Sequence, residues 1–206
     1  MTEKTEPTSL ERPLALVLGA TGGIGGALAA ALLQRGYRVR AMHRAPERQA
    51  TARPHYEWVR GDAMQAEDVL RAAEGASVIV HGVNPPGYQN WAELVLPMID
   101  NTIAAARAVG ARILMPGTIY NFGADTFPLI AEDNRQAPET VKGRIRVELE
   151  RRLEQAAEQG LPVLIVRAGD FFGPDAGNNW FAQGLVQPGK PVSFVVNPGR
   201  KGVGHA

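Results

Sequence analysis

Three glycines spaced three residues apart follow a short apolar run near the start of the chain. The run occupies residues 14–18, and Gly19, Gly22 and Gly25 come directly after it. From Ile24 onward, apolar side chains recur at helical spacing until Gly36, a residue suited to ending a helix. The segment therefore predicts a strand, a tight turn and a helix in direct succession, which is the start of a βαβ unit.

The same alternation of short β-rich runs and longer helical patterns continues along the chain. The expected strands are 14–18, 37–42, 56–60, 77–81, 112–115 and 163–167, and the expected helices are 23–34, 66–73, 91–109 and 139–159. Such alternation is typical of a mostly parallel sheet with right-handed crossovers. Because a barrel of this kind needs eight repeats, the pattern favours an α/β fold with a doubly wound sheet.

The length of 206 residues fits a single domain. Residues 1–12 lack an apolar run, so we expect a disordered lead-in that is neither a secretory signal nor an anchor. Residues 13–174 carry the α/β pattern. Residues 175–206 are rich in Gly, Pro and Asn. There we expect a helix near 180–186 and a strand at 192–196.

Charge and cysteine content exclude several classes of function. The 22 basic and 21 acidic residues give a net charge of +1, and no cysteine is present. This balance of charge gives no strong electrostatic field to attract nucleic acid or anionic lipid. The absence of cysteine excludes thiolate catalysis and Cys-ligated metals. We expect no metal, no nucleic-acid partner, no membrane partner and a cytoplasmic location.

The glycine turn predicts a phosphate site. Glycine lets a backbone approach a pyrophosphate closely, and the free N–H groups of the first helical turn face the anion. The spacing Gly-x-x-Gly-x-x-Gly differs from the dinucleotide fingerprint in its first interval, but its place between a strand and a helix is the required context. The expected phosphate contacts are Gly19, Thr21, Gly22, Gly23, Ile24 and Gly25.

Four segments resemble one family. They are the loop 18–25, the segment Met115-Pro-Gly-Thr-Ile-Tyr-Asn-Phe-Gly123, the segment Lys142-Gly-Arg-Ile-Arg-Val-Glu148, and the segment Arg167-Ala-Gly-Asp-Phe-Phe-Gly-Pro174. Together they are similar to the extended and atypical short-chain dehydrogenase/reductases, which include NAD-dependent epimerases and dehydratases. The resemblance spans about residues 14–196 and implies an NAD(P)-binding Rossmann fold. Family members continue with a substrate-binding part, of which residues 175–206 would form a truncated or reduced version.

The end of the second strand bears on the choice of dinucleotide. An acid about 20 residues beyond the loop accepts from the ribose of NAD, whereas an arginine there accommodates the 2′-phosphate of NADP. Here the strand runs into Arg44, with no acid before Glu47. Arg44 therefore favours NADP, with His43 or Arg40 as helpers and NAD as the alternative.

The resemblance implies further cofactor contacts. Asp62 and Ala63 would meet the adenine, although Asp62 also suits a helix N-cap. We interpret His81 as a packed histidine at the end of a strand and not as a catalyst. The other expected cofactor contacts are Gly82, Val83, Ala168, Gly169 and Phe171. Candidates for binding a substrate are Asn178, Asn179 and Trp180.

The catalytic pattern of the family is altered. Thr118 falls on its hydroxyl position, but Lys142 and Arg146 stand where the family has tyrosine and lysine. Three interpretations follow: Lys142 replaces the acid/base, Tyr120 supplies a phenol, or the site binds cofactor without redox chemistry. The helix also suits a solvated face on which arginines pair with glutamates, namely Arg144, Arg146, Arg151 and Arg152 with Glu148, Glu150 and Glu154.

The sequence thus predicts an oxidoreductase or epimerase-like enzyme that moves hydride at a carbonyl or secondary alcohol. The alternative is a non-catalytic NADP-binding sensor. A small-molecule substrate and a homodimer are the expected partners.

Overall fold

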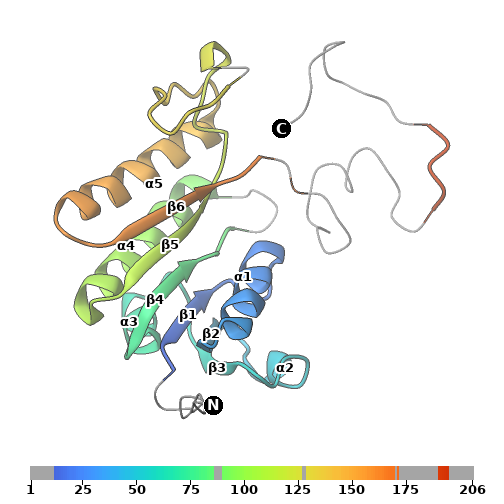
Figure 1. The fold of residues 1–206 in the computed structure, drawn as a ribbon, viewed down its shortest axis with the longest axis vertical. Helices are drawn as coiled ribbons and strands as arrows, with labels where there is room; N and C mark the ends of the chain where they lie inside the picture. Colours follow the sequence, from blue (N-terminus) through green and yellow to red (C-terminus); the bar gives the residue numbers. More distant parts are fainter. Residues whose placement is uncertain (1–11, 86–89, 127–128, 170, 172–189, 195–206) are drawn as a thin grey trace, which may run out of the picture.

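The computed structural model describes residues 12–85, 90–126, 129–169, 171 and 190–194. Six parallel strands form one sheet in the order β3-β2-β1-β4-β5-β6 (Figure 1). The strands are β1 (Leu14–Leu18), β2 (Arg38–His43), β3 (Glu57–Arg60), β4 (Ala76–His81), β5 (Arg112–Gly117) and β6 (Val163–Arg167). This order confirms the predicted doubly wound sheet, in which the direction of winding reverses between β1 and β4.

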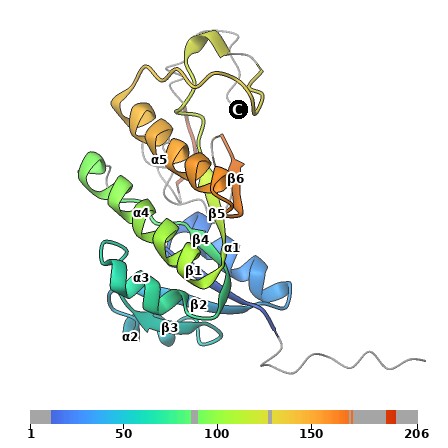
Figure 2. The ribbon, with the colours of Figure 1, turned by 90° about the vertical axis from the view of Figure 1, so that its left-hand side faces the viewer.

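Helices cover both faces of the sheet. They are α1 (Gly23–Gln34), α2 (Glu47–Ala50), α3 (Ala66–Ala73), α4 (Trp91–Val109) and α5 (Val141–Glu158), with a 3-10 turn η2 (Ala124–Thr126). Figures 1 and 2 show α1 on one face of the sheet and α3, α4 and α5 on the other. The side chains of β1 alternate accordingly, because Leu16 packs with the α3–α5 core and Val17 packs with Ala29 of α1.

The predicted and observed elements differ in a few places. The helix α2 was not predicted, since its four residues have no apolar period. Strand β5 continues through Pro116 to Gly117; Pro116 pairs with β6 beyond the end of the β4 pairing. The expected strand at 192–196 is wrong over 192–194, where the backbone forms no strand. The expected helix at 180–186 lies outside the described residues.

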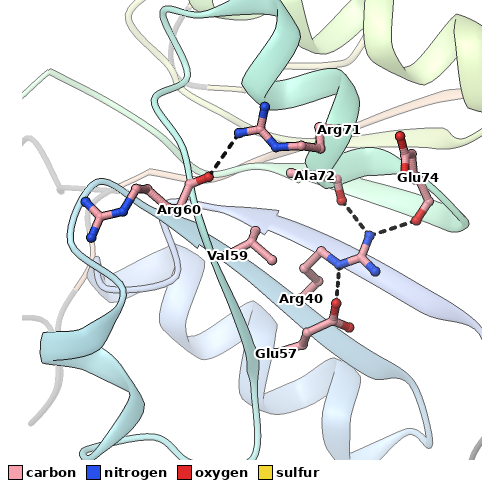
Figure 3. A pocket seen from close by; sticks show the side chains of 7 residues that line it. All are labelled: Arg40, Glu57, Val59, Arg60, Arg71, Ala72 and Glu74. Carbon is pink, nitrogen blue, oxygen red and sulfur yellow. Dashed lines mark hydrogen bonds and ion pairs between the residues drawn. The ribbon is translucent and has the colours of Figure 1, made fainter.

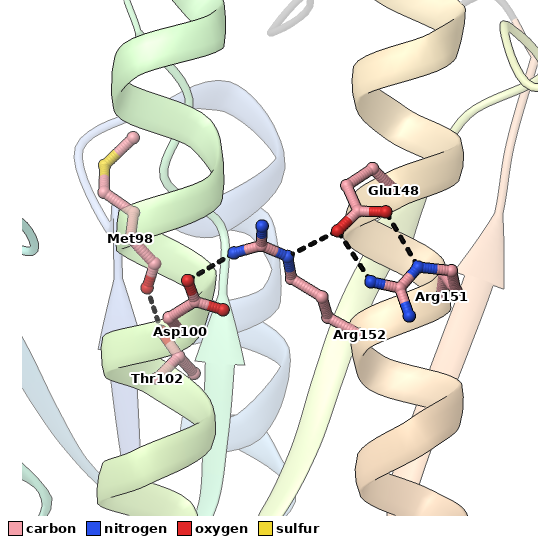
Figure 4. Close-up of polar contacts among 6 residues, drawn as sticks. All are labelled: Met98, Asp100, Thr102, Glu148, Arg151 and Arg152. Carbon is pink, nitrogen blue, oxygen red and sulfur yellow. Dashed lines mark hydrogen bonds and ion pairs between the residues drawn. The ribbon is translucent and has the colours of Figure 1, made fainter.

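Surface ion pairs join α4 and α5 (Figure 4). Glu148 accepts from Arg151 and from Arg152, and Arg152 also binds Asp100 of α4. These contacts confirm part of the solvated helix face expected for α5. Among the residues that the structure describes, no helix is long and apolar enough to cross a membrane.

Candidate functional site

The glycine loop lies where the strand order reverses. The backbone of Gly19 has a φ of 85°, and a Cβ placed there would lie 2.5 Å from the carbonyl oxygen of Gly82, which follows β4. A Cβ on Gly25 would lie 2.3 Å from the carbonyl oxygen of Gly19. Since real Cβ contacts are never this short, the close packing of β1, β4 and α1 at the loop requires glycine at these positions.

Gly22 differs from these glycines because protein packing does not require it. A Cβ there would meet a single atom within 4 Å, the Gly19 carbonyl oxygen at 3.4 Å, and its φ of −81° suits any residue. Gly22 is the N-cap of α1, no side chain caps the helix, and its first turn holds no acid. Thr21, Gly22, Gly23 and Ile24 are exposed. The loop therefore offers backbone N–H groups beside open space, which fits a pyrophosphate.

The end of β2 carries positive charge. Arg44 is exposed, and its carbonyl oxygen accepts from Arg60 at 2.9 Å. Arg60 also forms an ion pair with Glu47, the nearest acid along the chain. A backbone hydrogen bond, followed by the Arg60 contact, lowers the pKa of Glu47. Glu47 therefore stays ionised and is paired with Arg60.

Arg40 does not assist Arg44, so that expectation is wrong. Its guanidinium binds Glu57 and donates to the carbonyl oxygens of Ala72 and Glu74 at 2.8 and 2.7 Å. Figure 3 shows these contacts around a cavity of about 220 Å³ between β2, β3 and α3. Because α3 ends just before the amino end of β4, Arg40 is held away from the carboxyl ends of the strands.

Asp62 and Ala63 follow β3. Asp62 is not a helix N-cap, because α3 begins later, after Gln65. Its carboxylate accepts instead from the backbone N–H of Met64 at 3.0 Å, which closes a local turn. Ala63 is buried, and its carbonyl oxygen accepts from Asn101 of α4 at 2.9 Å. These contacts fix the shape of the loop after β3.

His81 ends β4 as a buried structural residue, as predicted. Its Nδ1 lies 2.8 Å from the hydroxyl of Thr102, and burial, with a smaller contribution from the charge of Arg146, lowers its pKa to about 3. Gly82 and Val83 follow, with the Gly82 N–H donating to Leu18 at 2.9 Å. These bonds join the loop after β4 to the glycine loop.

Lys142 and Arg146 share one face of α5, as predicted. Both cations lie over the ring of Trp91, with Lys142 Nζ at 5.7 Å and Arg146 Cζ at 5.0 Å from its centroid. Arg146 is 8% exposed and donates to Asn84, beyond the end of β4, at 3.1 Å. The solvated-face interpretation is therefore wrong for Arg146, which lies beside the carboxyl edge of the sheet.

Thr118 lies in a polar network. Its hydroxyl donates to Asn121 at 3.3 Å, Asn121 donates to Gln136 at 2.8 Å, and Gln136 donates to Glu150 at 2.9 Å. Arg167 binds both oxygens of Glu150 and donates to the carbonyl oxygen of Thr118 at 2.6 Å. Glu150 is 1% exposed, so it does not belong to the solvated face expected for it.

The backbone of Tyr120 lies against the first turn of α5, at Gly143. Its N–H approaches the Thr118 hydroxyl at 3.3 Å, and its side chain is 44% exposed. A Cβ on Gly143 would lie 2.3 Å from the Tyr120 carbonyl oxygen. The missing side chain at Gly143 therefore lets the loop after β5 pack against the first turn of α5.

The segment after β6 is partly described. Ala168 donates to Gly117 at 3.3 Å, Gly169 is half-buried, and Phe171 is 45% exposed. Asn178, Asn179 and Trp180 lie outside the described residues.

Several residues that shape this site were not predicted from the sequence. They are Arg53, Asn84, Asn121, Gln136, Glu150 and Arg167. Asn84 and Asn121 could have been found from their position just after parallel strands, where ligands bind in open sheets. The other four come from segments whose partners are distant in the sequence.

Comparison with known proteins decides the family. Residues 19–190 match the family model described as NAD(P)H-binding. The chain belongs to the NAD(P)H-binding family. Solved structures of the same fold include UDP-N-acetylglucosamine 4-epimerase from Bacillus cereus, with a TM-score of 0.70, 18% identity, and coverage of 84% of this chain and 58% of that one. The UDP-glucuronic acid 4-epimerase from Bacillus cereus, in complex with NAD, matches with a TM-score of 0.70 and 19% identity. The match covers 82% of this chain and 60% of that one.

Two curated relatives of this NAD(P)H-binding chain are named reductases. The 3-diazoavenalumate denitrifying reductase of a Streptomyces species is 32% identical over 184 residues, which cover 79% of this chain and 57% of that protein. The 2-alkyl-3-oxoalkanoate reductase of Stenotrophomonas maltophilia is 29% identical over 176 residues, which cover 77% of this chain and 51% of that protein. The chain therefore spans about half the length of these relatives. The predicted NAD(P)-binding family is confirmed, and the solved epimerase structures share the fold of this chain.

Proposed function

We propose that this chain is the cofactor domain of an NADP-preferring reductase that acts on a carbonyl group. The observation that carries the proposal is the network that holds Thr118 beside α5, at the carboxyl edge of the sheet. Burying the Glu150–Arg167 ion pair costs desolvation free energy, because charged groups leave water. We expect such a cost where the loop must hold a hydroxyl in one position.

The residues around the glycine loop would hold the cofactor. Backbone N–H groups at the start of α1 would bind the pyrophosphate, and Arg44 would bind the 2′-phosphate. Asp62 and Ala63 would border the adenine, and Gly82, Val83, Ala168, Gly169 and Phe171 would border the rest. When bound, the reduced nicotinamide supplies a hydride.

Thr118 would turn its hydroxyl proton from the Asn121 oxygen to the substrate oxygen and so stabilise the charge that develops there. Lys142 is the first candidate to give that oxygen its proton, because its chain neighbour Gly143 packs on the Tyr120 carbonyl oxygen, in the loop that carries Thr118. Tyr120 is the second candidate for this proton. Arg146, anchored by Asn84, would position the cofactor ribose rather than transfer a proton.

A specific observation favours a second function, a non-catalytic NADP-binding sensor. Position 142 carries lysine where the family motif has its tyrosine acid. A chain that had lost turnover could retain the glycine loop and the cofactor contacts.

Oxidation of NADPH across a panel of carbonyl compounds tests both functions. The intact chain should turn over at least one compound, and Thr118→Ala should lower kcat about a hundredfold. Comparing Lys142→Ala with Tyr120→Phe identifies the proton donor, because one of them should lower kcat while leaving NADPH affinity unchanged. NADPH binding without turnover of any compound would favour the sensor, and binding of neither NADPH nor NADH would refute both functions.

A further inference from the structure

Arg53 places a second cation beside the glycine loop. Its Nη1 donates to the carbonyl oxygen of Ala20 at 2.7 Å, across 33 residues of sequence. A Cβ built on Gly26 would lie 3.8 Å from Nη2, so the guanidinium also reaches the first turn of α1. Arg53 thus comes from a loop outside the Rossmann motifs and contacts the loop that would hold the pyrophosphate.

The position of Arg53 is fixed by several contacts. Its carbonyl oxygen accepts from the indole N–H of Trp58 at 3.0 Å, and its N–H donates to Gln49 at 3.0 Å. Trp58 in turn packs edge-on against His43, with ring centroids 6.3 Å apart. Because His43 immediately precedes Arg44, this aromatic contact joins the backbone of Arg53 to the loop that carries Arg44.

The sheet register brings the same segments together. Leu18 pairs with Met42, so Gly19 and Ala20 leave β1 level with His43 and Arg44 as they leave β2. The guanidinium of Arg53 at Ala20 and the side chain of Arg44 therefore border the same end of the β1–β2 pair. This is the end at which the adenosine ribose lies in Rossmann domains.

The charge at this place is positive. Within the described part of the chain, no carboxylate pairs with Arg53. Glu47 is held by Arg60. Neither Arg44 nor Arg53 forms an ion pair among the described residues, and two such arginines suit a dianionic phosphate monoester.

We propose that Arg53 and Arg44 together form a binding site for the phosphate monoester on the 2′ position of the adenosine ribose. Arg53 is then a specificity-determining residue that sequence position alone does not reveal. This inference rests on the NADP preference proposed above.

Titration calorimetry with NADPH, NADH, 2′,5′-ADP and 5′-AMP tests it without any substrate. Arg53→Gln should weaken NADPH and 2′,5′-ADP about tenfold or more, since one charged hydrogen bond is removed, while NADH and 5′-AMP stay within about threefold. Arg53→Lys should restore part of the difference. The control Arg48→Gln removes an exposed arginine of α2 and should change all four affinities by less than about threefold.

Three results would overturn the inference in distinguishable ways. If Arg53→Gln weakened all four ligands equally, Arg53 would support the loop through Ala20 and would not select the phosphate. If it left every affinity unchanged, Arg44 alone would carry the preference. If the intact chain bound NADPH and NADH equally, the NADP preference itself would fail, whatever the variants did.

Discussion

Arg167 binds Glu150 through both of its terminal nitrogens, at 2.8 and 2.7 Å, and the same guanidinium lies 5.0 Å from the Phe122 ring centroid. One arginine on β6 therefore joins α5 to the loop after β5. That loop carries Thr118, so the geometry of the candidate catalytic hydroxyl depends on an ion pair that does not include it.

Removing the carboxylate should destabilise the fold. Glu150→Ala leaves the half-buried Arg167 without its partner, and we expect the free energy of unfolding to fall by about 3 kcal/mol. Denaturant unfolding measures this change. The control Glu148→Gln disrupts partly exposed pairs with Arg151 and Arg152 and should cost less than about 1 kcal/mol. Equal costs for the two variants would contradict the role given to the buried pair.

Alanine at two glycines should separate folding from cofactor binding. Gly25→Ala forces a Cβ against the Gly19 backbone and should cost about 2 kcal/mol or more of stability. Gly22→Ala meets no such contact, so its stability should stay within about 0.5 kcal/mol of the parent. Its NADPH affinity should nevertheless fall, because the methyl group enters the space proposed for the pyrophosphate. Unchanged NADPH affinity in Gly22→Ala would place the pyrophosphate elsewhere.

The buried His81 should make stability depend on pH. Its pKa falls from the ordinary value of 6.5 to about 3 in the folded chain, first because of burial. The unfolded chain therefore binds the proton at higher pH than the folded chain, and the free energy of unfolding should decrease as the pH drops from 6.5 toward 3. Unfolding measured between pH 6.5 and 4.5 should show a shallower decrease for His81→Gln. His55→Gln, at an exposed histidine, should keep the parent slope.

Gly143→Ala should disturb the loop that carries Thr118 without removing a polar group. The new Cβ would lie 2.3 Å from the Tyr120 carbonyl oxygen and 2.5 Å from Pro138 Cβ, so the loop must move. We expect slower NADPH oxidation with little change in NADPH affinity, measured by steady-state kinetics and calorimetry. Val141→Ala, on the same turn but 63% exposed, serves as the control and should change neither. A loss of NADPH affinity as large as the loss of rate would argue that the loop supports the cofactor instead.

Local sequence determined most of the secondary structure. The bounds of α1, α3 and α4 follow from apolar period and from nearby glycines such as Gly36 and Gly110, which have positive φ values of 85° and 71°. The glycine loop and the strand pattern also fixed the class of fold, because both signals are confined to neighbouring residues. Helix α2 was missed because four residues carry too short a pattern.

Tertiary structure alone decided which charged residues belong to the site. Arg40, Arg44 and Arg53 are of one type and lie within 14 positions, yet one is bound to the end of α3, one is exposed, and one contacts the glycine loop. Glu148 and Glu150 are two residues apart, and one lies at the surface while the other is buried against Arg167. The reason is physical: the energy of a charge depends on its burial and on partners tens of residues away, which only the folded sheet brings together.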